Sequence, residues 1–233
     1  MITSVRIRDA LRESTIKLPV YSPSPDQPFF ITDVQGLGPV KADLMSSDYA
    51  NVDGGIIHST RVPMRNIILK VRYSPFYAQN QSSELIRQDL YNILPPKAKI
   101  LLTVNDNELE RVHINGVVES HEPTIFTKTP EVQISIVCPT PYFRLPTPKK
   151  LYGTLGCNLD VSGITSVETG FIFNFRAERY TEAIRIANGL QQDIYYGKPL
   201  DVGDRLKIST IPGDKYLNRN DGSGYYSDLD GLE

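Results

Sequence analysis

Residues 29–73 read FFITDVQGLGPVKADLMSSDYANVDGGIIHSTRVPMRNIILKVRY, and this stretch decides the fold. It opens with residues 29–34, a run rich in aromatic and β-branched side chains, which favour strands. It closes with residues 66–73, where apolar and basic side chains alternate as they do in a half-buried strand. We therefore predict two strands separated by a long polar loop, a unit built to present a surface.

Turn signals divide this stretch. Gly36, Gly38 and Pro39 stop the first strand, because they supply turn geometry and proline lacks the amide donor that a strand ladder needs. Within the polar loop, Asp53 and Gly54 mark a tight turn, since glycine accepts the positive φ that most residues avoid. No catalytic pattern accompanies these signals.

The composition indicates a folded protein with two domains. The chain has 233 residues, 40% of them hydrophobic and 22% charged, which is ordinary for globular proteins. The net charge of −2 argues against a protein that grips nucleic acid through a broad basic face. The N-terminus lacks a signal-peptide core and no run reaches about 20 apolar residues, so we expect synthesis in a cytoplasm and no membrane insertion.

The sequence offers no motif for a catalytic, cofactor or metal site. Cys138 and Cys157 lack zinc-ligand spacing and a neighbouring histidine, and we interpret them as buried free thiols. The histidines, His58, His113 and His121, are scattered, and the linear signatures of hydrolases, P-loops and dinucleotide-binding proteins are absent. We predict that the protein is not an enzyme, with no cofactor, although a pair of catalytic carboxylates would leave no linear pattern.

One helix is predicted, over residues 82–94. Its apolar residues recur at three- and four-residue spacing, and they are Leu85, Ile86, Leu90, Ile93 and Leu94. Ser82 or Ser83 is suited to cap the first turn, and Pro95 ends the helix. We expect its apolar stripe to pack on a sheet.

A hairpin and a further strand follow the helix. Residues 99–104 and 111–120 flank a polar turn, and we expect Val112, Ile114 and Val117 to face inward from the second strand. Residues 131–138 alternate apolar and polar side chains along their whole length, which predicts another strand.

The domain boundary is predicted inside the proline-rich stretch 139–150, which divides the chain into an N-terminal domain over 1–145 and a C-terminal domain over 146–233. In the second domain, Phe171, Phe173 and Phe175 share one face of a strand and are expected to anchor a small core. Further short strands are predicted over 183–187, 192–196 and 205–210, whereas the glycine-rich tail from residue 218 is predicted to be a loop. The predicted fold class is mainly β: an N-terminal β-sandwich or barrel with one α-helix, and a smaller C-terminal β-sandwich.

Four features in this order resemble the distal tail protein (Dit) family of tailed phages. They are GLGPVKADL at 36–44, VDGGIIHSTRVPMRNIILKV at 52–71, the helix followed by a hairpin, and GDRLKISTIPGDK at 203–215. The resemblance implies an N-terminal belt domain that assembles into a hexameric ring and a galectin-like or oligosaccharide-binding-like outer domain. The family usually continues into more strands after the last motif, so we expect an outer domain that is reduced, or completed by a partner's strand.

The resemblance implies a virion structural protein of the tail tip or baseplate. Its implied partners are further copies of itself, the tail tube protein, the tail-associated hub protein and receptor-binding or side-fibre proteins, with DNA only in transit through the lumen. A closed ring needs two different complementary surfaces on each chain. We place these contacts in the loop over residues 40–64 and its flanks, at Gly36, Gly38, Pro39, Asp53, Gly54, Arg65 and Asn66.

Two other classes of function stay open at this point. The second domain is alternatively a carbohydrate-binding module for host adhesion, with candidates for stacking on sugar rings at Tyr180, Tyr195, Tyr196, Tyr225 and Tyr226. Exposed tyrosines with glycan-dependent binding would favour that module, and buried tyrosines would favour a scaffold. A hydrolase of cell-wall glycans is supported only by the abundance of carboxylates, and a lysis zone on wall material would test it.

Overall fold

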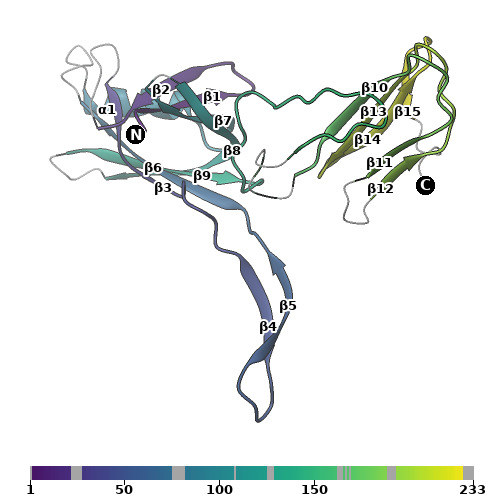
Figure 1. Cartoon of the computed structure of the whole chain (residues 1–233). Helices are drawn as coiled ribbons and strands as arrows, with labels where there is room; N and C mark the ends of the chain where they lie inside the picture. The colour runs from purple at the N-terminus through teal and green to yellow at the C-terminus, as the bar shows by residue number, and fades with distance from the viewer. Residues whose placement is uncertain are drawn as a thin grey trace. The chain divides into compact units, whose positions relative to one another are not determined.

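The computed structural model describes residues 2–21, 28–74, 82–107, 109–124, 129–161, 165, 167, 169–187 and 193–227. It is mainly β with one helix among these residues, which confirms the predicted fold class (Figure 1). The chain forms two compact units, Met1–Pro148 and Lys149–Glu233. The division lies three residues beyond the boundary predicted from sequence.

Unit 1 is built on one antiparallel sheet of seven strands in the order β2-β1-β7-β8-β9-β6-β3. Their bounds are β1 (Ser4–Asp9), β2 (Thr15–Pro19), β3 (Phe29–Gln35), β6 (Arg65–Tyr73), β7 (Lys99–Asp106), β8 (Leu109–Thr124) and β9 (Glu131–Cys138). The two ends of the sheet meet through a parallel bridge between Val20 and Ile31, where the Tyr21 N–H donates to the Ile31 carbonyl at 2.8 Å. The sheet therefore curls into a nearly closed barrel around one apolar core.

Strand β8 belongs to both halves of this barrel. It pairs with β7 up to Val117 and with β9 from Val117 onward, with a bulge between Val118 and Ser120. Val118 is buried and Val117 is only partly buried, so the expectation that Val117 faces inward is wrong by one residue. The inward position between Ile114 and Val118 is Gly116, where a Cβ would lie 2.6 Å from Ile136 Cγ2 and would not fit.

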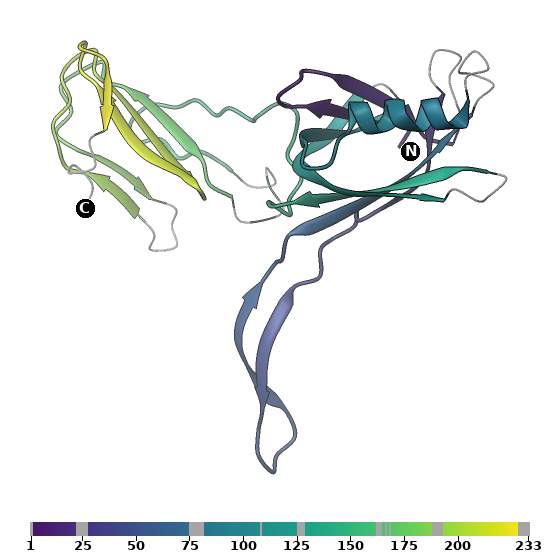
Figure 2. The same ribbon diagram turned by 180° about the vertical axis from the view of Figure 1, so that it is seen from behind.

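Helix α1 (Ser83–Ile93) covers the barrel core (Figure 2). The Ser82 hydroxyl accepts a hydrogen bond from the Leu85 N–H at 3.4 Å and caps the first turn, as predicted. Ile86, Leu90 and the following Leu94 are buried in the core. Leu85 is exposed instead, since the side of the helix on which it lies faces away from the core.

The segment between β3 and β6 forms a second, two-stranded sheet rather than a loop. Strands β4 (Asp43–Asp48) and β5 (Gly55–Arg61) pair antiparallel and project from unit 1 as an arm (Figure 1). The Tyr49 N–H donates to the Gly54 carbonyl at 3.1 Å and closes the turn at the tip. Gly54 has a φ of +105°, so the predicted tight turn is present.

Unit 2 has a four-stranded and a two-stranded antiparallel sheet. The first has the order β10 (Ile172–Arg176), β13 (Arg205–Ile211), β14 (Asp214–Asn220) and β15 (Tyr225–Ser227), and the second pairs β11 (Ile184–Ala187) with β12 (Asp193–Tyr196). The prediction of a loop after residue 218 is wrong there, because β14 and β15 extend the sheet. Phe173 and Phe175 pack on the core with ring centroids 6.3 Å apart, whereas Phe171 precedes the strand and is exposed.

Candidate assembly site

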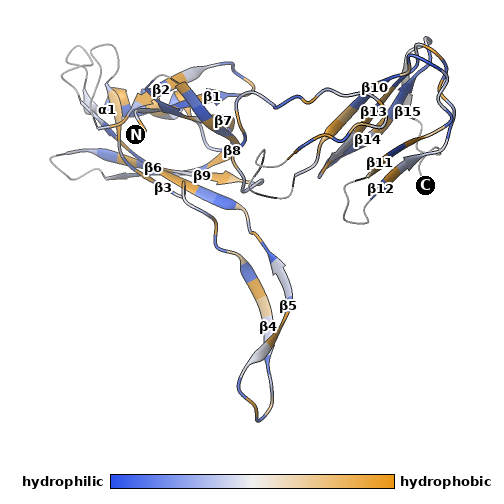
Figure 3. Cartoon of the chain, in the orientation of Figure 1, coloured by the Kyte–Doolittle hydropathy of each residue, from blue (hydrophilic) through white to orange (hydrophobic). Residues whose placement is uncertain are grey.

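The arm exposes apolar side chains along its whole length. None of the residues 43–61 is buried, and the ribbon of β4 and β5 includes hydrophobic segments (Figure 3). The large apolar residues exposed on the arm and its two ends are Leu44, Met45, Tyr49, Val52, Ile56, Ile57, Val62 and Met64. Isolated two-stranded hairpins are at best marginally stable in water. The arm thus carries an apolar surface for which its own chain supplies no covering layer among the described residues.

Polar contacts within the arm are few and exposed. The Ser47 hydroxyl and His58 Nε2 lie 2.7 Å apart, and Arg61 Nε lies 3.4 Å from the Asp43 carboxylate. Exposed ion pairs of this kind contribute about 0–1 kcal/mol, because water screens them. Both contacts lie within the hairpin, and neither joins it to the barrel.

The base of the arm is held by Arg65, a buried side chain at the start of β6. Its Nε donates to the Pro141 carbonyl at 2.6 Å, and its Nη1 donates to the carbonyls of Gly38, at 2.7 Å, and Gly36. The guanidinium also lies over the Phe143 ring, 4.7 Å from its centroid. Arg65 therefore ties the strand that leaves the arm to the turn that enters it and to the segment after β9.

Burial controls the chemistry around Arg65. Desolvation lowers the pKa of its guanidinium. Cys138, its direct partner in the β6–β9 register, is fully buried, and desolvation raises the pKa of its thiol to about 11. The thiol is therefore protonated at neutral pH and behaves as a small apolar core residue, as predicted for a buried free thiol. Cys157 is also a free thiol, but it is exposed, so the expectation that it is buried is wrong.

The turn at Gly36 requires glycine. Its φ is +84°, and a Cβ at this position would lie 2.1 Å from the Asn66 carbonyl oxygen. A surface hollow of about 150 Å³ opens beside this turn. It is lined by Gly36, Gly38, Pro39, Val40, Met64, Arg65 and Asn66.

The structure brings five of the seven predicted interface residues together. The hollow at the base of the arm is lined by Gly36, Gly38, Pro39, Arg65 and Asn66. Asp53 and Gly54 lie instead at the tip of the arm. Sequence reasoning missed Pro141 and Phe143, since it assigned residues 139–150 to a linker. It also missed the exposed pair Ile56 and Ile57, whose apolar character inside a polar loop was the available signal.

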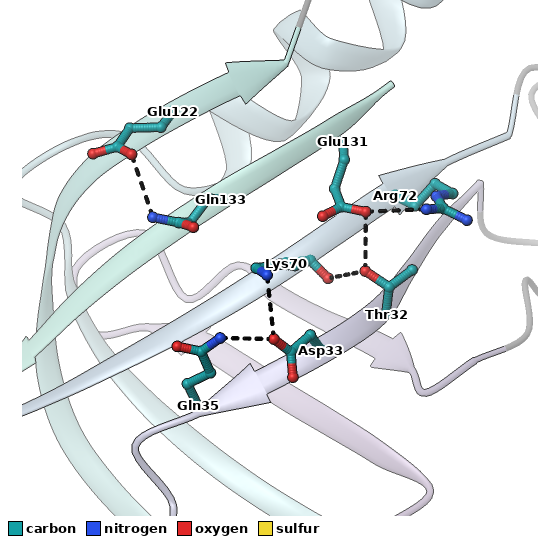
Figure 4. Close-up of polar contacts among 8 residues, drawn as sticks. All are labelled: Thr32, Asp33, Gln35, Lys70, Arg72, Glu122, Glu131 and Gln133. Atoms are coloured by element: carbon teal, nitrogen blue, oxygen red, sulfur yellow. Dashed lines mark hydrogen bonds and ion pairs between the residues drawn. The ribbon is translucent and has the colours of Figure 1, made fainter. Parts of the chain in front are cut away.

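A lattice of polar side chains covers the outer face of β3, β6, β9 and the second half of β8 (Figure 4). Glu131 accepts hydrogen bonds from Arg72 and Thr32, each at 3.2 Å. Asp33 pairs with Lys70 at 3.4 Å and accepts from Gln35 at 2.8 Å. The hydrogen bond from Gln35, followed by the contact with Lys70, lowers the pKa of Asp33.

This face is weakly acidic and its cations are occupied. Its described residues include four carboxylates, Asp33, Glu119, Glu122 and Glu131, and two cations, Lys70 and Arg72, both of which contact carboxylates. The remaining polar groups are also bonded to neighbours, as with Gln133 donating to Glu122 at 3.3 Å (Figure 4). The face presents little unpaired positive charge to a phosphate.

The tyrosines proposed for sugar stacking differ in exposure. Tyr180 and Tyr195 are exposed, at 58% and 37%. Tyr196 is fully buried in the core of unit 2, because it faces inward from β12 beside Ile184 and Leu200. Tyr196 thus presents no ring to a sugar, and among the described side chains the stacking prediction rests on Tyr180 and Tyr195. The side chains of Tyr225 and Tyr226 lie outside those that the structure describes.

Two further features of the described residues concern metal ions and membranes. Within the described parts of the chain, no group of three or more His, Cys, Asp or Glu side chains is placed to hold a metal ion. Among the same residues, no helix has the length and apolar character needed to span a bilayer.

Burial lowers the pKa of His121, whose ring packs edge-on against Tyr91 at a centroid distance of 5.2 Å.

The fold is similar to that of a solved phage Dit protein. No protein-family profile matches the sequence, and no curated protein is similar to it. Among solved structures, the Dit protein of phage SPP1 matches with a TM-score of 0.63 and 13% sequence identity. The match covers 98% of this chain and 86% of that one. The SPP1 protein is described as a paradigm of the hub adsorption apparatus in phages that infect Gram-positive bacteria. The predicted resemblance is confirmed at the level of fold.

Two structures of the phage P2 baseplate in its activated conformation also match, one with Ca and one with Sr. Each has a TM-score of 0.43 and 12% identity. The first match covers 100% of this chain and 89% of the other, and the second covers 99% and 88%.

Proposed function

We propose that this chain is a structural component of a phage tail tip or baseplate. It assembles with copies of itself into a ring, six by analogy with the Dit family, and joins the tail tube to the hub. Its second unit carries receptor-binding or side-fibre proteins, and no catalytic step is assigned to it. The fold shared with SPP1 Dit supports the class of protein, and the arm carries the argument for assembly.

The arm supports self-assembly because its apolar side chains need a surface outside their own barrel. Eight large apolar residues are exposed on a hairpin and its ends, which have no second layer among the described residues. Contiguous apolar surface on a folded protein marks an interaction site. A head-to-tail ring supplies such a surface, since each copy lays its arm on the neighbour and receives another.

The polar face of β3, β6, β9 and β8 suits a wall past which DNA moves. Lys70 and Arg72 are neutralised by Asp33 and Glu131, so phosphates meet carboxylates and amides rather than unpaired cations. A net negative face avoids the counterion-release affinity that basic grooves have for DNA. We assign this face to the lumen of the ring.

Mutation of the arm tests the assembly. The triple variant Met45→Ser, Ile56→Ser and Ile57→Ser removes exposed apolar side chains only, so the barrel should fold unchanged. We expect the natural chain to form rings by mass and negative-stain imaging and the triple variant to be monomeric, with the same circular dichroism. Leu109→Ser, an exposed apolar residue of the barrel, is the matched control and should leave the rings intact.

Two outcomes would contradict this proposal. Rings formed by the triple variant as readily as by the natural chain would show that the arm does not carry the contact. A chain that stays monomeric at every concentration, and also with tube and hub proteins added, would contradict the ring itself.

A further inference from the structure

The outer face of the four-stranded sheet in unit 2 gathers positive charge. The inward residues of β10, β13 and β14 form the core, with Phe173, Phe175, Leu206, Ile208 and Leu217. Because side chains alternate along a strand, the intervening residues lie on the opposite face. That face carries Asn174, Arg176, Arg205, Lys207, Tyr216, Asn218 and Asn220, which are exposed or half-buried.

The strand register places these groups side by side. Arg176 is directly opposite Arg205, and Asn174 is directly opposite Lys207. On the other side of β13, Arg205 is opposite Asn220 and Lys207 is opposite Asn218. The Lys207 ammonium also lies over the Tyr216 ring, 5.3 Å from its centroid. Directly opposed residues have Cβ atoms about 4.5–5.5 Å apart, so both guanidinium groups can reach one ligand.

This arrangement opposes folding of the unit. Like charges directly opposite one another in a sheet repel and destabilise it. Elsewhere in unit 2, arginines contact carboxylates: Arg219 donates to Asp204 at 2.7 Å, and Arg185 contacts Asp193. Among the described residues, Arg176 and Arg205 make no side-chain hydrogen bond or ion pair.

Among the paired positions of β10, β13 and β14 on this face, the acidic group lies far along the strands from the two arginines. Asp214 lies opposite Ile211, six residues along β13 from Arg205, which is about 20 Å at roughly 3.3 Å per residue. Asp204, the sequence neighbour of Arg205, is buried and bound by Arg219. The two arginines therefore share an electropositive patch that its own sheet does not neutralise.

We propose that this face binds a phosphate-bearing polyol or sugar polymer. Two opposed guanidinium forks match the several acceptor oxygens of one phosphate, which arginine binds bidentately. The flanking amides of Asn174, Asn218 and Asn220 are suited to hydroxyl groups, which they meet as donors or acceptors. Single-stranded nucleic acid fits less well, because base stacking needs aromatic rings, and the outward positions of β10, β13 and β14 offer Tyr216, already covered by Lys207.

The site is additional to ring assembly and lies on other residues. The test uses the full chain and a synthetic oligo(glycerol phosphate), with dextran as the uncharged polymer and an oligothymidylate of equal phosphate number as the nucleic acid. Isothermal titration calorimetry should show binding of the glycerol phosphate polymer that weakens with added salt, since salt screens exposed charges. The double variant Arg176→Gln and Arg205→Gln should bind about tenfold more weakly.

Arg185→Gln is the matched control, because it removes an exposed arginine of the same unit from the other sheet. It should change the affinity less than about twofold. Both glutamine substitutions on the patch should leave the thermal midpoint of unit 2 equal or higher, since they relieve repulsion; a structural role would lower it.

Several results would overturn the proposal: equal loss of binding in Arg185→Gln, equal binding of dextran, or no binding of the glycerol phosphate polymer. Equal or tighter binding of the oligothymidylate would reassign the patch to nucleic acid. None of these results bears on ring formation, which the arm variants test separately.

Discussion

The barrel and the arm of unit 1 come from one continuous segment, yet they treat apolar side chains in opposite ways. Strand β6 buries every second residue from Arg65 to Tyr73, and those from Ile67 onward belong to the barrel core. Strands β4 and β5 are exposed at every position, although they include Leu44, Ile56 and Ile57. The contrast indicates that the barrel is stabilised within the chain, whereas the arm depends on a surface outside its unit.

The largest expected effect is the difference in stability between a substitution in the barrel and a substitution on the arm. Leu69→Ala empties part of the barrel core and should reduce the free energy of unfolding of unit 1 by about 2–5 kcal/mol, through lost burial and a cavity. Ile57→Ala removes an exposed side chain from the arm and should change it by less than about 0.5 kcal/mol in the monomer. Urea unfolding followed by circular dichroism measures both, and comparable losses would remove the distinction between the regions.

Arg65 joins the two regions, so its substitution should have the next largest effect. Arg65→Met leaves the carbonyls of Gly36, Gly38 and Pro141 without their donor and should cost about 2–4 kcal/mol. Arg65→Lys keeps the charge but cannot reproduce the planar fork, and should recover only part of the loss.

The rate of thiol labelling at Cys138 measures the effect of the Arg65 substitution at the base of the arm. Cys157 is exposed and Cys138 is buried directly opposite Arg65, so the native chain should react quickly at one thiol and slowly at the other. Arg65→Met should accelerate the slow reaction, because opening at the base of the arm exposes Cys138. An unchanged rate would show that Arg65 does not hold the base closed.

The sequence predicted the barrel better than the arm, and the contrast explains why. Alternation of buried and exposed side chains is a local pattern, so residues 29–34, 66–73 and 131–138 could be assigned as strands without other information. The arm lacks that pattern because neither face is buried, and it therefore resembled a polar loop. Its strands depend on hairpin pairing that periodicity does not encode.

The candidate site was predictable only in part for a related reason. Gly36, Gly38 and Pro39 announce a turn, since their backbone requirements are local. The contacts of Arg65 with Pro141 and Phe143 join residues more than 70 positions apart, and no local signal specifies them. The arginine pair of unit 2 was not predicted for the same reason. Arg176 and Arg205 become neighbours through the register of β10 and β13, which no local sequence pattern specifies.

The smallest expected effect concerns acid, and it should again separate barrel from arm. Asp9, in the barrel, accepts hydrogen bonds from the Leu11 N–H at 2.7 Å and from the Arg12 N–H at 3.0 Å. Both bonds lower the pKa of the Asp9 carboxyl, and the bond from Arg12 is the larger cause. A carboxylate whose pKa is lower in the folded state stabilises the fold above its unfolded pKa of about 3.9, and this contribution is lost as the pH falls through the folded value. Asp9→Asn should therefore slightly lower the stability of unit 1 at pH 7 and flatten its decline below about pH 5. Asp43→Asn, on the arm, is the control and should leave the loss of circular dichroism with falling pH unchanged. If both variants flatten this loss equally, Asp9 does not contribute more than Asp43 to acid unfolding.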